Sequence, residues 1–314
     1  MKCRLTVVIP TYRRIDSVER LLTLLANQTI ADQMQVVLVD QNEKGVLERE
    51  LGISGRSRVE HIWLDRPNAS LARNVGAKRS FGEYLLFLDD DLLPDAEFCE
   101  RGIVFFQKYD FVRCLVPRLR DRAPEGSPSH GDETSGVRRQ LVQKINSELY
   151  RITDTMSAAV FMARDAFFQS GGFDPLLFEF ARTAEDQEFF LRLNFKGINL
   201  YYTPSISVVH DDSQAGGCDL RTTDYWVTRE KCIKAWVYRY RIHRGGDLSL
   251  GLADLLRLSR SVFVNRAGLT SGVPSVRRQI GLLKAALHET SKFLVSYRGK
   301  YSVPKAIDHL VDEL

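Results

Sequence analysis

The chain has 314 residues, of which 44% are apolar and 27% are charged, and this composition excludes intrinsic disorder for most of its length. The net charge of +4 is too small to indicate nucleic-acid binding by itself. It hides an asymmetry, because residues 219–314 hold 17 Lys and Arg against 9 Asp and Glu, whereas residues 1–218 hold 27 against 31. An acidic first part and a basic last part predict two regions with different functions.

The cysteines and the apolar runs exclude several classes of protein. Five widely spaced cysteines without a C-x-x-C pair argue against a zinc or redox centre, and we expect free thiols in a cytosolic protein. They are Cys3, Cys99, Cys114, Cys218 and Cys232. The first apolar run is too short for a signal peptide and predicts a strand. No run approaches the roughly 18 apolar residues of a membrane-spanning helix.

Through the first 210 residues, short apolar runs alternate with helical spacings of apolar residues. Strands are expected over residues 5–9, 36–39, 59–64, 84–88, 158–163 and 200–209, and helices over residues 17–27 (capped by Asp16), 70–78 (entered through Asn68) and 184–196. This alternation predicts an α/β fold with a mostly parallel sheet covered by helices on both faces. Such sheets bind ligands at the carboxyl ends of their strands.

Turn-forming residues interrupt this pattern. A surface loop is expected over residues 117–136, a turn at Gly171 and Gly172, and the end of the α/β pattern over residues 213–217. Long helices are then expected over residues 220–243, 248–265 and 276–296, separated by Gly245 and Gly246 and by residues 268–274. We therefore expect an α/β domain over residues 1–216 and a basic helical region over residues 217–314.

Three adjacent carboxylates, Asp89, Asp90 and Asp91, follow the apolar strand of residues 84–88. Because like charges at this spacing repel one another, a cation is needed to stabilise them. Mg²⁺ or Mn²⁺ meets that need and also binds the phosphates of a substrate. The alternative is a solvated acidic turn, and the position at the end of an apolar strand favours the metal.

Two weaker signals come later in the chain. Glu185 and Asp186 open an amphipathic helix, and a short irregular segment before it can carry their carboxylates to a cleft. Acidic residues are common in a first helical turn because they suit the helix dipole, so a structural interpretation competes. His210 ends the last strand, and a single histidine is more often structural than a metal ligand.

Together these segments resemble glycosyltransferase family 2 in their order and spacing. The matching segments are VVIPTYRR at 7–14, VLVD at 37–40, NASLARNVG at 68–76, LDDD at 88–91, GGFD at 171–174, Glu185 with Asp186, and His210. The resemblance covers residues 4–212. It implies the GT-A fold, a Rossmann-like arrangement, and transfer of a sugar from a nucleotide sugar with inversion at the anomeric carbon.

The resemblance also implies a role for each matching position. The residues that would bind the nucleotide sugar are Pro10, Thr11, Tyr12, Arg13, Asp40, Arg73, Asp89 and Asp90. Asp40 would accept a hydrogen bond from the base, and Arg73 would approach the diphosphate. Asp91 and His210 would bind Mn²⁺ or Mg²⁺. Asp186 would be the general base, with Glu185 supporting it or touching the acceptor.

The residue types suit this chemistry. A metal and an arginine stabilise the charge that develops on a leaving diphosphate, and a carboxylate can take the proton of an attacking hydroxyl. Two segments depart from the family pattern: residues 41–43 are Gln-Asn-Glu where Asp-Gly-Ser is common, and residues 156–159 lack a Gly-Asn type of sequence. These departures concern the contacts to the base, ribose and donor sugar, and they leave every essential carboxylate in place.

Aromatic and basic side chains interleave over residues 225–244. The favoured interpretation is a helix that packs its aromatic residues on the catalytic domain. Contact with an anionic membrane surface is the alternative, and binding of single-stranded nucleic acid is the least favoured. The amphipathic helices expected over residues 248–265 and 276–296 fit the first two.

The sequence thus predicts an inverting, metal-dependent glycosyltransferase in the cytoplasm or at the inner membrane face. Its acceptor would be a saccharide or a lipid-linked saccharide, and the family suggests bacterial surface polysaccharide synthesis. A sugar nucleotidyltransferase should instead carry a glycine-rich, basic phosphate loop after the first strand, where this chain has Pro10, Thr11 and Tyr12. The presence of Asp89, Asp91 and Asp186 argues against a nucleotide-sugar-binding or membrane-associating module that has lost catalysis.

Overall fold

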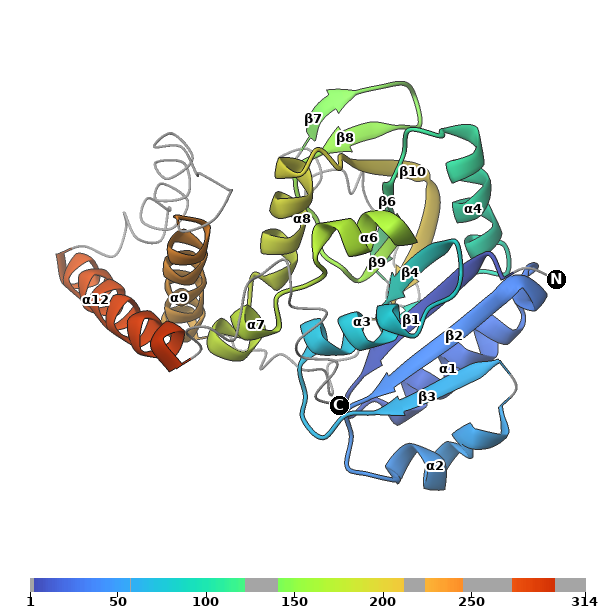
Figure 1. Cartoon of the computed structure of the whole chain (residues 1–314), viewed down its shortest axis with the longest axis horizontal. Coiled ribbons are helices and arrows are strands. Elements are labelled where there is room, and N and C mark those ends of the chain that lie inside the picture. Colours follow the sequence, from blue (N-terminus) through green and yellow to red (C-terminus); the bar gives the residue numbers. More distant parts are fainter. Residues whose placement is uncertain (1–2, 57, 122–140, 212–223, 245–272, 297–314) are drawn as a thin grey trace, which may run out of the picture.

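The computed structural model describes residues 3–56, 58–121, 141–211, 224–244 and 273–296 (Figure 1). The strands of this part form one sheet in the order β3-β2-β1-β4-β9-β6-β10-β8-β7, and β5 pairs with β10 outside that path. The strands are β1 Leu5–Thr11, β2 Met34–Asp40, β3 Val59–Trp63, β4 Tyr84–Leu88, β5 Leu92–Leu93, β6 Cys114–Asp121, β7 Leu141–Lys144, β8 Tyr150–Ile152, β9 Ala159–Ala163 and β10 Leu200–His210.

The central sheet is largely parallel. Strands β3, β2, β1 and β4 pair in parallel, as do β6 and β10. Strand β9 lies between β4 and β6 and is antiparallel to both, and the short strands β5, β7 and β8 also pair in antiparallel fashion. The predicted α/β fold with a mostly parallel sheet is confirmed, and the carboxyl ends of β1, β2 and β4 lie at one edge.

Helices cover both faces of the sheet (Figure 1). They are α1 Ile15–Ala26, α2 Val46–Leu51, α3 Ala69–Lys78, α4 Phe98–Lys108, α6 Arg164–Ser170, α7 Pro175–Ala181, α8 Glu185–Phe195, α9 Tyr225–Arg244 and α12 Val273–Ser296. Two short 3₁₀ turns, Ala31–Gln33 and Ile53–Gly55, lie beside β2 and β3. One apolar cluster joins α1, α2 and α4 to the sheet, and others join α3, α6 and α8 to the opposite face.

The continuous apolar runs are explained by burial on both faces of the sheet. Val7 and Ile9 pack on the α1 and α4 side, whereas Val8, between them, packs on the other side. In β4, Leu86 belongs to the first cluster and Phe87 to the second. Because successive side chains of a strand point to opposite faces, a strand covered on both sides needs apolar residues at every position.

Some predicted boundaries were wrong. Asp16 does not cap α1, because the helix begins at Ile15 after Arg14, which makes no side-chain capping hydrogen bond. The expected loop from residue 117 begins later, because β6 continues to Asp121 by pairing with β10. Helix α7 occupies the segment that was expected to be irregular before Glu185, with Asp174 as its cap.

In the C-terminal region, α9 and α12 match two of the expected helices, and α12 begins earlier, at Val273. It includes Pro274, which a first helical turn tolerates because its missing N–H has no intrahelical partner. The expected loop over residues 122–136, the break over residues 213–217 and the helix over residues 248–265 lie outside the described residues. None of the described helices is both long and apolar enough to span a bilayer.

The close approach of α3 to β1 depends on Gly76. A Cβ at this position would lie 2.3 Å from Val8 Cγ1, whose side chain is fully buried in the sheet. We predict that Gly76→Ala lowers the free energy of unfolding by about 1–3 kcal/mol, because overpacking shifts the helix or the strand. Urea unfolding monitored by circular dichroism measures the change.

Gly281→Ala is the matched control, because Gly281 lies inside α12 with nothing within 4 Å of its ideal Cβ. An alanine there is expected to raise stability by up to about 1 kcal/mol through helix propensity. Equal effects of the two substitutions would contradict the close packing of α3 on the sheet.

Candidate active site

The predicted site residues gather at the carboxyl edge of the sheet. Thr11 and Asp40 end β1 and β2, and Asp89 follows β4 directly. His210 ends β10 and pairs with Leu92 of β5, next to Asp91. The backbone N–H of Asp211 also donates to Asp91 O (2.9 Å), which ties the end of β10 to the acidic segment.

Two arginines hold the three adjacent carboxylates. Arg73 Nη2 lies 2.9 Å from Asp89 Oδ1. Arg14 Nη1 lies 2.9 Å from Asp90 Oδ1 and 2.7 Å from Asp91 Oδ2. From the sequence, we expected a metal ion to neutralise the repulsion among these carboxylates. In the structure, the positive charges of the two arginines neutralise much of it. Arg14 was not among the predicted site residues, although its place just after β1 was a usable signal.

The three carboxyl groups have different electrostatic environments. Burial raises the pKa of Asp90 to about 6, although Arg14 and the hydroxyl of Thr11, which donates to Oδ2 at 2.7 Å, act in the opposite direction. Burial also raises the pKa of Asp89, against the effect of Arg73. For Asp91, burial is outweighed by the hydrogen bond from His210 and the charge of Arg14, so its pKa lies below the usual value.

Asp91 and His210 lie close together and are of the types that bind divalent cations, but by themselves they would supply only part of a coordination shell. Asp91 Oδ1 is buried and has no hydrogen-bond partner, while Oδ2 faces Arg14 and lies 3.4 Å from His210 Nε2. The described residues contain no cluster of three or more side chains that could form a complete metal site. A cation at these two side chains would therefore need oxygens of a substrate and of water, as is usual for Mg²⁺ with phosphates.

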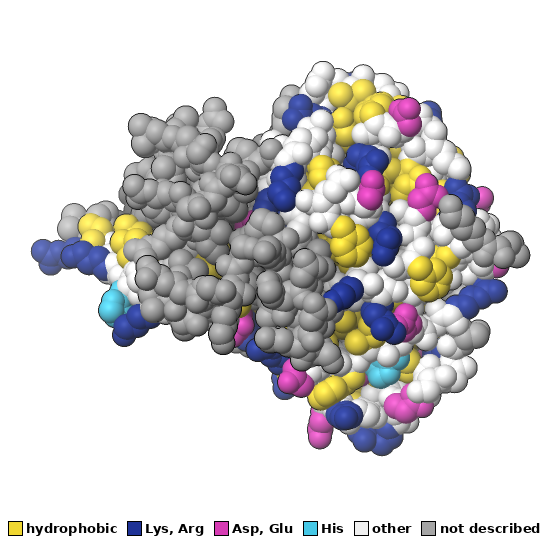
Figure 2. All heavy atoms as spheres, viewed as in Figure 1, with side chains coloured by type: hydrophobic (Ala, Val, Ile, Leu, Met, Phe, Trp, Pro, Cys, Tyr) yellow, Lys and Arg dark blue, Asp and Glu magenta, His cyan; other side chains and the backbone are white. Residues whose placement is uncertain are grey.

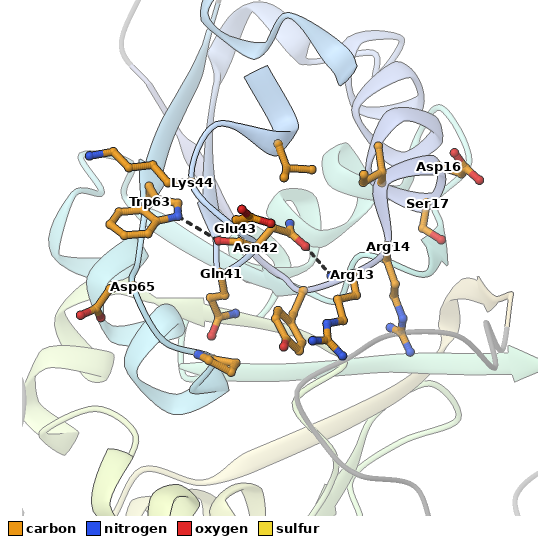
Figure 3. A pocket seen from close by; sticks show the side chains of 14 residues that line it. Arg13, Arg14, Asp16, Ser17, Gln41, Asn42, Glu43, Lys44, Trp63 and Asp65 are labelled. Carbon is orange, nitrogen blue, oxygen red and sulfur yellow. Dashed lines mark hydrogen bonds between the residues drawn. The ribbon is translucent and has the colours of Figure 1, made fainter. Parts of the chain in front are cut away.

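A cavity of about 930 Å³ has Arg14, the ion-pair partner of Asp90 and Asp91, in its wall (Figure 3). Its walls come from the segments that follow β1, β2 and β3. They include Tyr12, Arg13, Arg14, Gln41, Asn42, Lys44 and Trp63. A volume of this size suits a small-molecule ligand such as a nucleotide.

Asp40 and Pro10 are buried and do not line this cavity. Asp40 is 0% exposed, and its Oδ1 accepts hydrogen bonds from the backbone N–H (2.9 Å) and side-chain amide (2.7 Å) of Asn42. Its Oδ2 lies 3.1 Å from His61 Nε2. Asn42 in turn accepts from Arg13 N (2.6 Å) and, through its carbonyl, from Trp63 Nε1 (2.9 Å). Asp40 thus fixes the turn that forms the cavity wall, and sequence reasoning missed His61, Asn42 and Trp63.

Helix α3 carries Arg73, which bonds Asp89 and is affected by the charges of Asp186 and Glu185. Asn68 caps the helix by accepting from Leu71 N (3.0 Å), as predicted. Arg73 is buried, its guanidinium lies 5.4 Å from the Phe173 ring, and its Nε and Nη1 have no hydrogen-bond partner. Burial lowers the pKa of Arg73, but the charges of Asp89, Asp186 and Glu185 raise it above the usual value.

Asp186 lies in the first turn of α8 and is held by Ser157. Ser157 Oγ donates to Asp186 Oδ1 (2.5 Å), and Ser157 N donates to Oδ2 (3.2 Å). The next residue, Ala158, accepts from Asp89 N at 2.8 Å. Residues 156–159, one of the two segments that depart from the family pattern, therefore link Asp186 to the acidic segment of Asp89, Asp90 and Asp91. Ser157 was not predicted as a site residue.

The family model described as Glycosyl transferase family 2 matches residues 6–169. An uncharacterised glycosyltransferase of Haemophilus influenzae is 28% identical over 197 residues, which are 60% of this chain and 61% of that protein. The O-antigen biosynthesis protein RfbC of Myxococcus xanthus is 25% identical over 249 residues, which are 72% of this chain and 19% of that protein. The chain thus spans about three fifths or less of these relatives.

Two solved structures have a similar fold. Residues 1–349 of S. aureus TarS in complex with UDP-GlcNAc align with a TM-score of 0.58 at 17% identity, over 98% of this chain and 88% of that one. The mannosyltransferase PcManGT from Pyrobaculum calidifontis, in complex with GDP-Man and Mn²⁺, aligns with a TM-score of 0.56 at 14% identity. The alignment covers 95% of this chain and 88% of that one. These likenesses confirm the predicted GT-A fold. Since the family model covers more than half of the sequence, the chain belongs to glycosyl transferase family 2.

Proposed function

We propose that this chain transfers a sugar from a nucleoside diphosphate sugar to a hydroxyl group of a saccharide or lipid-linked saccharide, with inversion at the anomeric carbon. Residues 1–216 would hold both substrates. The observation that carries the proposal is the position of Arg73. Its buried guanidinium bonds Asp89, interacts with the charges of Asp186 and Glu185, and keeps two nitrogens without partners.

The donor would bind with its base in the cavity, between Tyr12 and the Asn42–Trp63 wall. Arg13 lies over the Tyr12 ring at 4.8 Å and would stabilise that wall. Pro10 and Asp40 would act indirectly, because they shape the strand ends that carry the wall. Thr11 and Asp90 are bonded to each other, and with Asp89 they would contact the ribose side of the donor.

The diphosphate would lie between the cavity and Arg73. The guanidinium of Arg73 would supply positive charge near the diphosphate oxygens as negative charge develops on the leaving group. Asp91 and His210 would hold Mn²⁺ or Mg²⁺, which when bound would neutralise part of the same charge. The Mn²⁺ bound together with GDP-Man in the Pyrobaculum calidifontis mannosyltransferase supports a divalent metal that accompanies the donor, without identifying its ligands here.

Asp186 would act as the general base. The acceptor hydroxyl oxygen forms a bond to the anomeric carbon on the face opposite the diphosphate, the bond from that carbon to the phosphate oxygen breaks, and the hydroxyl proton moves to Asp186. The two hydrogen bonds from Ser157 would orient the carboxylate, and Glu185 would contact the acceptor or support Asp186. Proton transfer to a positioned group typically contributes about 10²–10⁴-fold in rate.

A surface polysaccharide role is supported by the names of two relatives. One is RfbC, an O-antigen biosynthesis protein. The other is TarP of Staphylococcus aureus, a poly(ribitol-phosphate) beta-N-acetylglucosaminyltransferase, which is 32% identical over 97 residues, or 29% of this chain and 30% of that protein. A sugar nucleotidyltransferase is disfavoured, because Arg14 in the segment after β1 is bonded to Asp90 and Asp91.

We predict that Asp186→Asn lowers transfer by about 10²–10⁴-fold and leaves nucleotide binding intact, since the base acts on the acceptor proton only. Release of nucleoside diphosphate from UDP-, GDP- and dTDP-sugars with a saccharide acceptor measures transfer. Thermal shift with UDP, GDP and dTDP, with and without Mn²⁺, measures binding. Asp110→Asn, an exposed carboxylate at the other end of the sheet, is the control.

Two results would count against this proposal. Undiminished turnover of Asp186→Asn would remove the assignment of the base. Absence of a thermal shift with every nucleotide would contradict the whole donor site.

We also propose that the enzyme acts in the cytoplasm, in peripheral contact with the inner face of the membrane. A row of basic side chains on α12 supports this proposal. Arg277, Lys284, His288 and Lys292 are exposed on one side of the helix, because their spacing brings them to the same face. Ala286, on the opposite side, packs against α9. Figure 2 shows basic side chains at this end of the molecule. Anionic lipids attract such clusters.

We predict that the double substitution Lys284→Glu and Lys292→Glu weakens binding to phosphatidylglycerol vesicles at low salt, because each lysine near the surface contributes about 1 kcal/mol. Vesicle sedimentation measures binding, with phosphatidylcholine vesicles as the neutral reference. The control is Arg49→Glu with Lys144→Glu, which changes the charge equally at exposed positions elsewhere. If the two double substitutions weakened vesicle binding equally, the net charge of the protein, and not α12, would explain the binding.

A further inference from the structure

Helix α9 is packed on the segment that leads to the proposed base. Leu176, Leu177 and Ala181 of α7 form a buried cluster with Ala235 and Tyr238 of α9. Each of these side chains is at most 2% exposed. Figure 1 shows α7 between α9 on one side and the sheet with its covering helices on the other.

A buried polar contact fixes the register of this packing. Tyr238 Oη donates to Asp174 Oδ2 at 3.0 Å, and both side chains are 1% exposed. The other oxygen of Asp174 caps α7 by accepting from the backbone N–H of Leu176 (3.0 Å) and Leu177 (3.2 Å). One carboxylate thus joins the start of α7 to the middle of α9.

Helix α3 holds the same segment from the opposite side. Asn74 accepts from Phe173 N and donates to Phe173 O, both at 2.9 Å. Asn68 donates to Pro175 O at 3.0 Å. The segment around Asp174 is therefore held between α3, which carries Arg73 of the donor site, and α9.

The chain between α7 and Asp186 has an unfavourable backbone conformation. Arg182 (φ 54°) and Ala184 (φ 66°) both lie in the left-handed region, which costs free energy in residues other than glycine. Such a conformation persists only where the surrounding packing determines it. Ala184 and Phe180 contact the α7–α9 cluster, and Phe293 of α12 packs against Phe180 with ring centroids 4.9 Å apart.

We propose that Tyr238 is a positioning residue for the transfer reaction. Through Asp174 and α7, it holds the entry to α8 so that the Asp186 carboxylate faces the acceptor hydroxyl. The helices α9 and α12 are then part of the catalytic unit and not a separate appendage. This inference rests on the proposed function, because the role of Asp186 as the base is proposed there.

Tyr238→Phe tests the inference, because it removes the hydroxyl and keeps the ring in the cluster. Turnover (kcat) is expected to fall by about 10- to 100-fold, since small misplacements of a reacting group have effects of this size. The KM for the donor sugar and the thermal shift with UDP and Mn²⁺ are expected to stay at wild-type values. Hydrogen exchange over residues 176–190 is expected to become faster.

Tyr109→Phe is the matched control. Its hydroxyl donates to Glu148 Oε1 (2.5 Å) and accepts from Asn146 (3.0 Å), beside α4 and away from the site residues. Turnover of this variant should stay within about twofold of wild type, as expected for a residue without contact to the site.

Unchanged turnover of Tyr238→Phe would overturn the inference and assign Tyr238 to packing alone. A higher KM for the donor with unchanged turnover would overturn it as well, because α9 would then act on the donor site. Asp186→Asn separates the two proposals. Full activity of Asp186→Asn removes the proposed base, whereas its inactivity together with an active Tyr238→Phe removes only the role of α9.

Discussion

The arrangement of the site depends on one electrostatic constraint, the placement of three adjacent carboxylates at the end of a buried strand. Repulsion among Asp89, Asp90 and Asp91 is offset because Arg14 and Arg73 approach from different sides. Each carboxylate is thereby directed to a different neighbour: Asp89 to α3, Asp90 to the end of β1, and Asp91 to His210. Only Asp91 keeps a buried oxygen without a partner, so the assignment of the metal to Asp91 has a physical basis.

This constraint explains the position of α3. Arg73 reaches Asp89 because α3 lies directly on the sheet, and Gly76 allows that approach by placing no side chain against Val8. The same helix holds the segment around Asp174 through Asn68 and Asn74. Helix α3 therefore contacts both the acidic segment of the donor side and the segment that leads to the proposed base, which favours a reaction in which positioning supplies much of the rate enhancement.

The sequence predicted the parts of the fold that depend on local pattern. Strands buried on both faces read as continuous apolar runs, so β1, β2 and β4 were found, and the Asn68 cap was found because capping is local. The contacts of Ser157 with Asp186 and of Tyr238 with Asp174 could not be predicted, because the partners lie far away in the sequence, whereas Arg14 offered a signal by its place just after β1. Asp40 was predicted to touch the base, yet the structure buries its carboxylate between Asn42, which bonds Oδ1, and His61, which lies at Oδ2. Helix α7 was missed although Asp174 and Pro175 form a local start signal, and its apolar residues are buried against α9.

The separation of roles among the three carboxylates can be tested most directly by anomalous diffraction from crystals of this chain grown with UDP and Mn²⁺. The expected result is a manganese peak in contact with Asp91 and the diphosphate, with the base in the cavity beside Tyr12 and Arg73 bound to phosphate oxygens. Manganese bound away from Asp91, or a nucleotide bound outside that cavity, would contradict this assignment of roles to the three carboxylates.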